Sequence, residues 1–250
     1  MADDPVVYWA GQQIPLILTD TCIAGDAIGL NSSGNWVRAD ADVAAPIRAE
    51  FFALQRGNVS GDEIKVAKQV VLYDKDAPYV KGALQFLSGT AGKHTETNPI
   101  AAGDLVQCLG KALSTEYVHL DAELPHLTVP FSLVSTLPAT AANYGNIFVA
   151  DRNWRIIGAR EAHTVAGSDA GAVTLTLEKL TDTQALDAGV TMLAGTFNLK
   201  ATADTEQAVG PTATVANARL KPGDRVALKD AGVLTVVAGV SGSATFVEDL

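Results

Sequence analysis

The sequence predicts a mainly β protein with two domains. The 250-residue chain is 48% hydrophobic but only 6% aromatic, and its 22 glycines separate short apolar runs. Short apolar runs bounded by turn residues are typical of strands rather than of long helices. A chain of this length has room for two domains of about 100 to 150 residues, each with a core of its own.

The charge and hydropathy of the chain argue against two classes of binding partner, nucleic acid and membrane. The chain has 18 basic and 28 acidic residues, a formal net charge of -10. Because a surface that binds phosphates is basic, direct binding of nucleic acid is not expected. No apolar run approaches the roughly 20 residues of a membrane helix, and the first residues are acidic where a signal peptide is basic. We therefore expect a soluble protein made in the cytoplasm, with no membrane partner.

Residues 1–21 are predicted to form an amino-terminal arm. Pro15 interrupts an apolar run there, which disfavours a central strand because proline has no N–H to donate. Tyr8, Trp9 and Leu16 are apolar residues near a chain end and need a surface to pack on. They either cover their own domain or lie on a neighbouring subunit. The second alternative makes these three residues candidate subunit or capsid contacts.

Residues 22–121 are predicted to form a small β-rich domain. A Gly-Asp dipeptide precedes apolar runs in this domain and once beyond it, at Gly25-Asp26, Gly61-Asp62, Gly103-Asp104 and Gly223-Asp224. Glycine tolerates the positive φ of a tight turn, and aspartate can bond backbone two residues further on, so each dipeptide is predicted to start the next strand. A calcium loop needs several carboxylates spaced around a glycine, and no segment has that pattern.

Two features of this domain concern local structure. Residues 45–59 leave helix and strand both open, because Pro46 and Gly57 suit the ends of a helix while the apolar residues between them also suit a strand. Gly110 interrupts a later apolar run and is a candidate β-bulge.

Residues 122–145 are predicted to be a linker, because Pro125, Pro130 and Pro138 interrupt both helix and central strand. Residues 146–250 are predicted to form an antiparallel β-sandwich like a jelly roll. Turn signals recur there roughly every 8 to 12 residues, the rhythm of such folds.

The second domain is predicted to open with a strand pair over residues 147–163. Alternation places Trp154, Ile156 and Gly158 on one face of it. Residues 167–171 are predicted to be a hairpin loop. The return strand that follows it turns three residues inward, namely Val173, Leu175 and Leu177.

A charged cluster lies in the first strands of this domain. It consists of Arg152, Arg155 and Arg160 with Glu161. These arginines are either solvated surface with weak ion pairs or contacts to another subunit. The second reading makes them candidate subunit or capsid contacts.

The sequence contains no recognisable catalytic motif. Its four histidines are scattered without zinc-ligand spacing, and it has neither a phosphate-binding loop ending in Lys-Ser or Lys-Thr nor a Gly-x-Ser-x-Gly turn. Cys22 and Cys108 stand far apart and are expected to be small buried residues rather than a disulfide or metal pair. No catalytic, cofactor-binding or metal-binding residue is predicted, and the chain is not expected to be an enzyme.

Three segments of the first domain resemble the small β-rich domain of bacteriophage capsid decoration, or cement, proteins. They are AGDAIGLNSSGNWVRADAD at residues 24–42, VLYDKDAPYVKGALQFLSGTAGKHTETNP at 71–99, and AAGDLVQCLGKALSTEYVHLD at 101–121. The order and spacing of the three segments carry the resemblance more than any one of them.

The second domain is similar to the carboxy-terminal domain of phage head and head-fibre proteins. The matching segments are ADRNWRIIGAREAH, GSDAGAVTLTLEKL, AGTFNLKATADT and LKPGDRVALKD. Together the resemblances imply a structural virion protein on the capsid exterior, without cofactor, which binds the major capsid protein and braces neighbouring capsid subunits. They also imply a homo-oligomer, with a trimer favoured.

An alternative function is an exposed binding module on the virion that recognises a host-surface glycan. Aromatic side chains such as Tyr144 or Trp154 could stack on sugars, although Trp154 alternates with apolar residues and is expected in the core. A depolymerising enzyme has no sequence feature in its favour.

Overall fold

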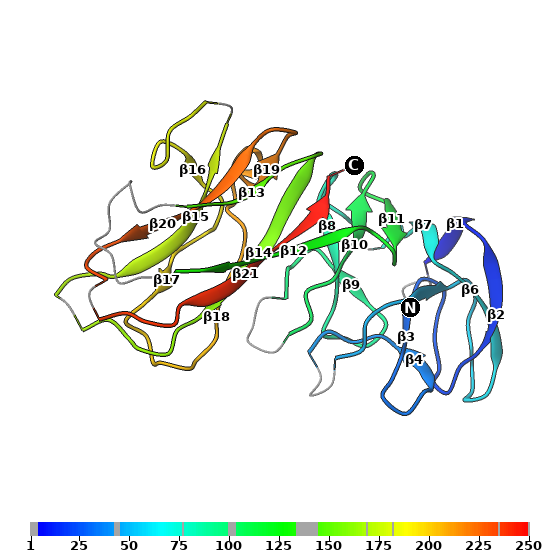
Figure 1. Ribbon diagram of the computed structural model, residues 1–250. Helices are drawn as coiled ribbons and strands as arrows, with labels where there is room; N and C mark the ends of the chain where they lie inside the picture. Colours follow the sequence, from blue (N-terminus) through cyan, green and yellow to red (C-terminus); the bar gives the residue numbers. More distant parts are fainter. Residues whose placement is uncertain are drawn as a thin grey trace. The chain divides into compact units, whose positions relative to one another are not determined.

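The structure is a computed structural model, which describes residues 5–42, 46–76, 78–99, 104–133, 145–168, 170–181, 183–234 and 236–249. The chain divides into two compact units, Met1–Leu124 and Pro125–Leu250. Regular structure in both is almost entirely antiparallel β (Figure 1), which confirms the predicted fold class. Among the described residues, the one helix is α1 (Val215–Ala218). It is far too short to span a membrane, and the described residues contain no helix that is long and apolar enough to cross a bilayer.

The first unit contains a six-stranded sheet in the order β1-β7-β11-β10-β8-β9. These strands are β1 (Val6–Ala10), β7 (Gln69–Tyr73), β8 (Leu84–Leu87), β9 (His94–Thr95), β10 (Cys108–Ala112) and β11 (Tyr117–Asp121). The pairing of β10 with β8 slips between Cys108 and Gly110. Gly110 has φ +150, and a Cβ there would lie 2.0 Å from the carbonyl oxygen of His119. The bulge predicted at this glycine is therefore confirmed.

A second sheet of the first unit has the order β2-β6-β5-β3-β4. Its strands are β2 (Gln13–Ile17), β3 (Ala27–Leu30), β4 (Trp36–Arg38), β5 (Phe51–Ala53) and β6 (Glu63–Ala67). Pro15 lies in β2, which is an edge strand as proline requires. Because β1 pairs with β7 and β2 pairs with β6, residues 6–17 pack on their own unit.

The stretch that left helix and strand open contains strand β5, so the helix alternative over 45–59 is wrong. Phe52 pairs with Ala27 on one side and with Ala67 on the other. Its ring is fully buried among side chains from both sheets. Strands on both sides of β5 supply the backbone hydrogen bonds that a helix would have made within itself. The local sequence does not indicate this pairing with distant strands.

Buried side chains of both sheets form the core of the first unit. The largest of these side chains include Phe52, Leu72, Leu87, Leu109 and Leu120. Cys22 and Cys108 are buried free thiols, which confirms their predicted role as small core residues.

The second unit is a jelly roll. Its two sheets have the orders β12-β21-β14-β18 and β13-β20-β15-β16, and short strands β17 and β19 pair with β15 and β14. The strands are β12 (His126–Ser132), β13 (Asn146–Val149), β14 (Trp154–Ala162), β15 (Thr174–Leu180), β16 (Val190–Thr191), β17 (Phe197–Asn198), β18 (Gln207–Val209), β19 (Arg219–Leu220), β20 (Arg225–Ala231) and β21 (Ser241–Glu248). Of the eight principal strands, the first, eighth, third and sixth make one sheet. The second, seventh, fourth and fifth make the other, as in a double Greek key.

Chain-neighbouring strands of this unit mostly lie in opposite sheets, which corrects two predictions. Residues 147–163 contain two strands, but β13 pairs with β20 and β14 pairs with β21, so they are not a strand pair. The hairpin predicted around residues 167–171 is also wrong, because the flanking strands β14 and β15 lie in different sheets. The inward direction of Val173, Leu175 and Leu177 is confirmed, since all three are in the core.

The predicted linker is wrong for residues 126–132, which form β12. This strand pairs with β21 along its whole length, and Val129 and Phe131 are buried in the core. Pro130 is tolerated because β12 is the edge strand of its sheet. Pro138 lies outside the described residues.

The long strand β14 changes phase in its middle. Its pairing with β21 slips between Ile156 and Gly158. Trp154 and Ile156 point into the core before the slip, and Ala159 does so after it. The predicted face with Gly158 beside Trp154 is therefore wrong beyond Ile156, because one extra residue reverses the alternation.

The Gly-Asp dipeptides form the predicted turns. Gly25, Gly61 and Gly223 have φ of +86, +94 and +90. Each following aspartate donates its N–H to the carbonyl oxygen three residues earlier and accepts that residue's N–H on its carboxylate, at 2.9 to 3.1 Å for the latter bond. The side-chain bond thus runs three residues backward, not two forward. Strands β3, β6 and β20 begin at the next residue; Gly103 lies outside the described residues.

Replacing Gly223 by alanine is predicted to destabilise the second unit by about 1–2 kcal/mol. The left-handed backbone there penalises a Cβ even though no atom lies within 4 Å of it. Thermal unfolding of the full chain, followed at the indole NMR signal of Trp154, measures the change. Gly195→Ala is the matched control, since a Cβ there meets only Val209 at an ordinary 3.9 Å. Equal effects of the two variants would contradict the prediction.

Candidate functional site: an aromatic face on the first unit

Strand β1 exposes two consecutive aromatic residues because it contains a bulge. Its pairing with β7 slips between Val7 and Trp9, so Tyr8 is an extra residue. Val7 and Ala10 pack against the core on either side of the slip. Tyr8 and Trp9 consequently both face outward, 71% and 48% exposed. Strict alternation would have buried one of them.

Tyrosines of the neighbouring strands continue this surface. Tyr73 of β7 is opposite Val6 on one side and Tyr117 of β11 on the other. The Tyr8 and Tyr117 rings meet edge to face at 5.4 Å, and those of Tyr73 and Tyr117 lie 5.1 Å apart. Such pairs hold the rings in place, so the surface is partly ordered before any partner binds.

We call this surface the aromatic face. It comprises the outward residues of three adjacent strands, namely Val6, Tyr8, Trp9, Val71, Tyr73, Tyr117 and His119. It lies along β1, the edge strand of its sheet. Exposed apolar residues gathered over neighbouring strands indicate an interaction surface more strongly than the same residues scattered singly.

Two of the candidate contacts from the arm lie in this face, and the third does not. Tyr8 and Trp9 are part of it, whereas Leu16 is only 9% exposed and belongs to a core cluster with Ile64 and Val66. Leu16 is therefore wrong as a contact residue. It points inward from β2, and its exposed neighbour is Ile17.

The three arginines belong to the second unit and do not form one cluster. Arg152 lies 5.7 Å from the Trp154 ring and 3.8 Å from a Glu248 carboxylate oxygen. Arg160 is paired with Glu206. Arg155 and Arg160 are half-buried on β14, five residues or about 16 Å apart along the strand. These pairs hold Arg152 and Arg160 on the surface of their own unit.

Trp154 is buried and does not offer a platform for a sugar. It is 6% exposed, and its Nε1–H donates to Asp151 at 2.9 Å. This hydrogen bond is the main cause that lowers the pKa of the exposed Asp151 carboxyl. The expectation that Trp154 is a core residue is confirmed, while Tyr144 lies outside the described residues.

A groove of about 320 Å³ also lies in the first unit, with Asp26, Tyr79, Lys93 and His94 in its wall. Asp26 is buried and accepts a bond of 2.6 Å from the Lys93 Nζ. Burial raises the pKa of this carboxyl, and the lysine opposes the rise. The paired charges stabilise the groove wall and leave no free nucleophile between them.

Tyr79 and His94 form a stacked pair in the same groove. Their rings are 5.8 Å apart, and the Tyr79 hydroxyl lies 3.1 Å from His94 Nε2. Burial raises the pKa of Tyr79 to about 12. Burial, with Lys93 nearby, lowers the pKa of His94 to about 4. Both groups are neutral at pH 7, so the imidazole tautomer determines which of the two donates this hydrogen bond.

No group of three or more His, Cys, Asp or Glu side chains comes together within the described ranges in a way that could hold a metal ion. The predicted place of Glu161 in a charged cluster with the three arginines is wrong, because Glu161 is buried and bonds to His163 and Gln207. The sequence did not predict this buried polar cluster. Gly158, as a bulge signal, was the feature that could have indicated that Glu161 points inward.

No protein-family model and no curated protein matches the chain. Among solved structures, that of the infectious bursal disease virus Gx strain aligns with 98% of this chain and 70% of its own, at 12% identity and a TM-score of 0.23. A mutant VP2 protein of infectious bursal disease virus, from derived T=1 particles, aligns with 98% and 68%, at 11% identity and a TM-score of 0.23. Likeness at this TM-score carries no argument about fold or function.

The first unit is predicted to lose stability as the pH falls from about 6.5 towards 4. The folded-state pKa of His94 is about 4, below its ordinary 6.5, so the unfolded chain binds the proton more readily. The stability contribution of the neutral imidazole is complete above 6.5 and is lost in that window. Unfolding of the full chain, followed at the Trp36 indole signal, measures the loss.

His94→Gln should flatten this acid dependence, because it removes the titrating group. His119→Gln, a change at a half-buried histidine on the same unit, should leave it in place. An unchanged acid profile in His94→Gln would show that another group is responsible.

Proposed function

We propose that this protein is a structural virion protein that binds the outer surface of a bacteriophage capsid and stabilises the shell by bridging capsid subunits. The observation that carries the proposal is the aromatic face, with Tyr8 and Trp9 exposed side by side on an edge strand. Tyrosine and tryptophan are among the residues that contribute most to protein–protein binding.

The physical action of such a protein follows from mass action. A ligand that binds an assembled lattice and not its free subunits stabilises the assembly by its binding free energy. Large aromatic side chains serve this role because they bury much apolar area with few rotatable bonds. The rings of Tyr8, Tyr73 and Tyr117 already contact one another, which reduces the entropy lost when a partner binds.

Two further observations support the proposal. The sequence resembles capsid decoration proteins over 24–121 and phage head or head-fibre domains over the second half. The jelly roll of the second unit is a fold used by viral capsid domains, and also by lectins, so this support is by analogy. The proposed partner is the major capsid protein, and the proposed state is a homo-oligomer, with a trimer favoured. We further propose that the protein acts on the capsid exterior and not as an enzyme.

Replacing Tyr8 and Trp9 together by alanine is predicted to weaken binding to undecorated phage heads by about 3 kcal/mol or more, over a hundredfold. The reason is the loss of two exposed aromatic anchors, while the residues of β1 on both sides of the bulge remain paired with β7. Co-sedimentation of the full chain with heads lacking it measures affinity, and the survival of heated heads measures stabilisation.

Ile17→Ala is the matched control, since Ile17 is 60% exposed on β2, the edge strand of the other sheet. It should bind as the wild type does. If the wild-type chain neither binds such heads nor protects them, the proposed function is wrong. A specific signal on a glycan array in its place would favour the glycan-binding alternative.

A further inference from the structure

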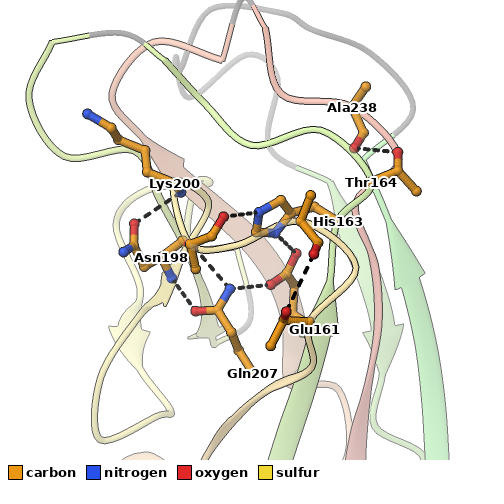
Figure 2. A network of polar contacts seen from close by, with 10 residues as sticks. Glu161, His163, Thr164, Asn198, Lys200, Gln207 and Ala238 are labelled. Atoms are coloured by element: carbon orange, nitrogen blue, oxygen red, sulfur yellow. Dashed lines mark hydrogen bonds and ion pairs between the residues drawn. The ribbon is translucent and has the colours of Figure 1, made fainter.

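A fully buried acid–base pair lies at one end of strand β14. The Glu161 and His163 side chains have no exposed surface, and Nδ1 of His163 is 3.0 Å from Oε1 of Glu161. Figure 2 shows both side chains turned towards the segment from Asn198 to Gln207. They reach this position because the slip in β14 directs Glu161 inward, as it does Ala159.

Each remaining polar atom of the pair bonds to that segment. His163 Nε2 is 3.1 Å from the Ala201 carbonyl oxygen, and Gln207 Nε2 donates to Glu161 Oε2 at 2.7 Å. Gln207 also exchanges bonds with the Asn198 backbone. The Asp204 N–H donates to the His163 carbonyl oxygen at 2.8 Å. The two side chains and the His163 carbonyl thus attach the segment to the end of β14, next to the backbone pairing of Gln207 with Glu161.

The hydrogen-bond partners of Glu161 and His163 determine how many protons the two side chains hold. A carbonyl oxygen only accepts, so His163 Nε2 carries a hydrogen. The short contact between Nδ1 and Oε1 then needs one further proton, placed on either atom. With that proton the pair has no net charge. Without that proton, the lone pair of His163 Nδ1 faces a buried carboxylate. With a second proton, the Glu161–His163 pair carries a buried positive charge.

We propose that Glu161 and His163 share one buried proton that holds the segment from Asn198 to Gln207 against β14, and that withdrawal of this proton at alkaline pH releases the segment. This proton-dependent latch is independent of the capsid-binding proposal, which rests on the first unit. It would make one end of the jelly roll responsive to pH.

The surrounding elements supply no second charge to the pair. On β14 and its partner segment, Arg160 is paired with Glu206, the Lys200 Nζ donates to the Gly171 carbonyl oxygen, and Asp204 is exposed. Strand β21 places uncharged Gly242 and Ser241 opposite Glu161 and Ala162. The adjoining loops contribute Thr164 and Ala238, which bond to each other. Within the described residues, His163 is the charged partner of the Glu161 carboxyl.

The sign of the pH effect follows from the unfolded chain. There, glutamate and histidine titrate near about 4.3 and 6.5, so the two together hold one proton between those values. Above 6.5 the unfolded pair gives up its proton to water, whereas in the folded state the same loss leaves a buried carboxylate facing the lone pair of Nδ1, so stability falls as pH rises. Burial raises the pKa of Glu161, with the His163 bond opposing, which acts in the same direction. Below about 4.3 the unfolded pair takes a second proton, and stability falls again.

Amide hydrogen exchange of the full-length protein tests the latch. After correction for intrinsic rates, the wild-type amides of Asn198, Lys200 and Asp204 should exchange about tenfold faster or more at about pH 8.5 than at about pH 6. Glu161→Gln should abolish this difference. Its neutral amide donates to Nδ1 and accepts from Gln207 at either pH, so no proton needs to be held.

Glu206→Gln is the matched control, because it removes an exposed carboxylate from the same segment. It should keep the wild-type response. An equal pH response in wild type and Glu161→Gln, or no response in wild type, would overturn the proposal. If Glu161→Gln fails to fold, the ring-nitrogen NMR signals of His163 in the wild type decide. A hydrogen on Nε2 at about pH 6 supports the latch, and its absence there overturns it.

Discussion

Strand β21 is hydrogen-bonded on both sides, to β12 and to β14, and the second unit depends on that double pairing. The last strand of the chain thereby joins the first and third strands of the jelly roll. Its inward residues Ala244 and Phe246 are buried against side chains from the opposite sheet. Because β12 and β21 pair residues more than a hundred positions apart, the unit cannot acquire its core until both ends of its chain have come together.

Two β-bulges decide which side chains reach solvent and which reach the interior. In β1 the slip at Tyr8 turns two neighbouring aromatic residues outward, which creates the aromatic face. In β14 the slip after Ile156 turns Glu161 inward, which creates the buried polar pair. The same device thus acts in opposite directions in the two units. In each case a single inserted residue changes the surface or interior chemistry of everything beyond it on the strand.

The turns are the feature that both units share. A positive-φ glycine followed by an aspartate closes a turn at Gly25, Gly61 and Gly223, and the aspartate both donates to and accepts from the backbone of the residue three positions earlier. These bonds satisfy backbone groups that would otherwise lack partners just before a strand begins. These turn aspartates therefore have a structural role, and they account for part of the net charge of -10.

The sequence by itself determined the β class, the turns at Gly-Asp, the edge position of Pro15 and the burial of both cysteines, since each depends on residues close in sequence. It also singled out Tyr8 and Trp9, because large aromatic residues near a chain end need a partner surface. Only the tertiary structure decided that residues 126–132 are a strand, that Leu16 is buried, and that Glu161 meets His163 and Gln207. Strand order and bulges set these outcomes. Both depend on pairing between distant segments, which alternation along a single strand does not encode.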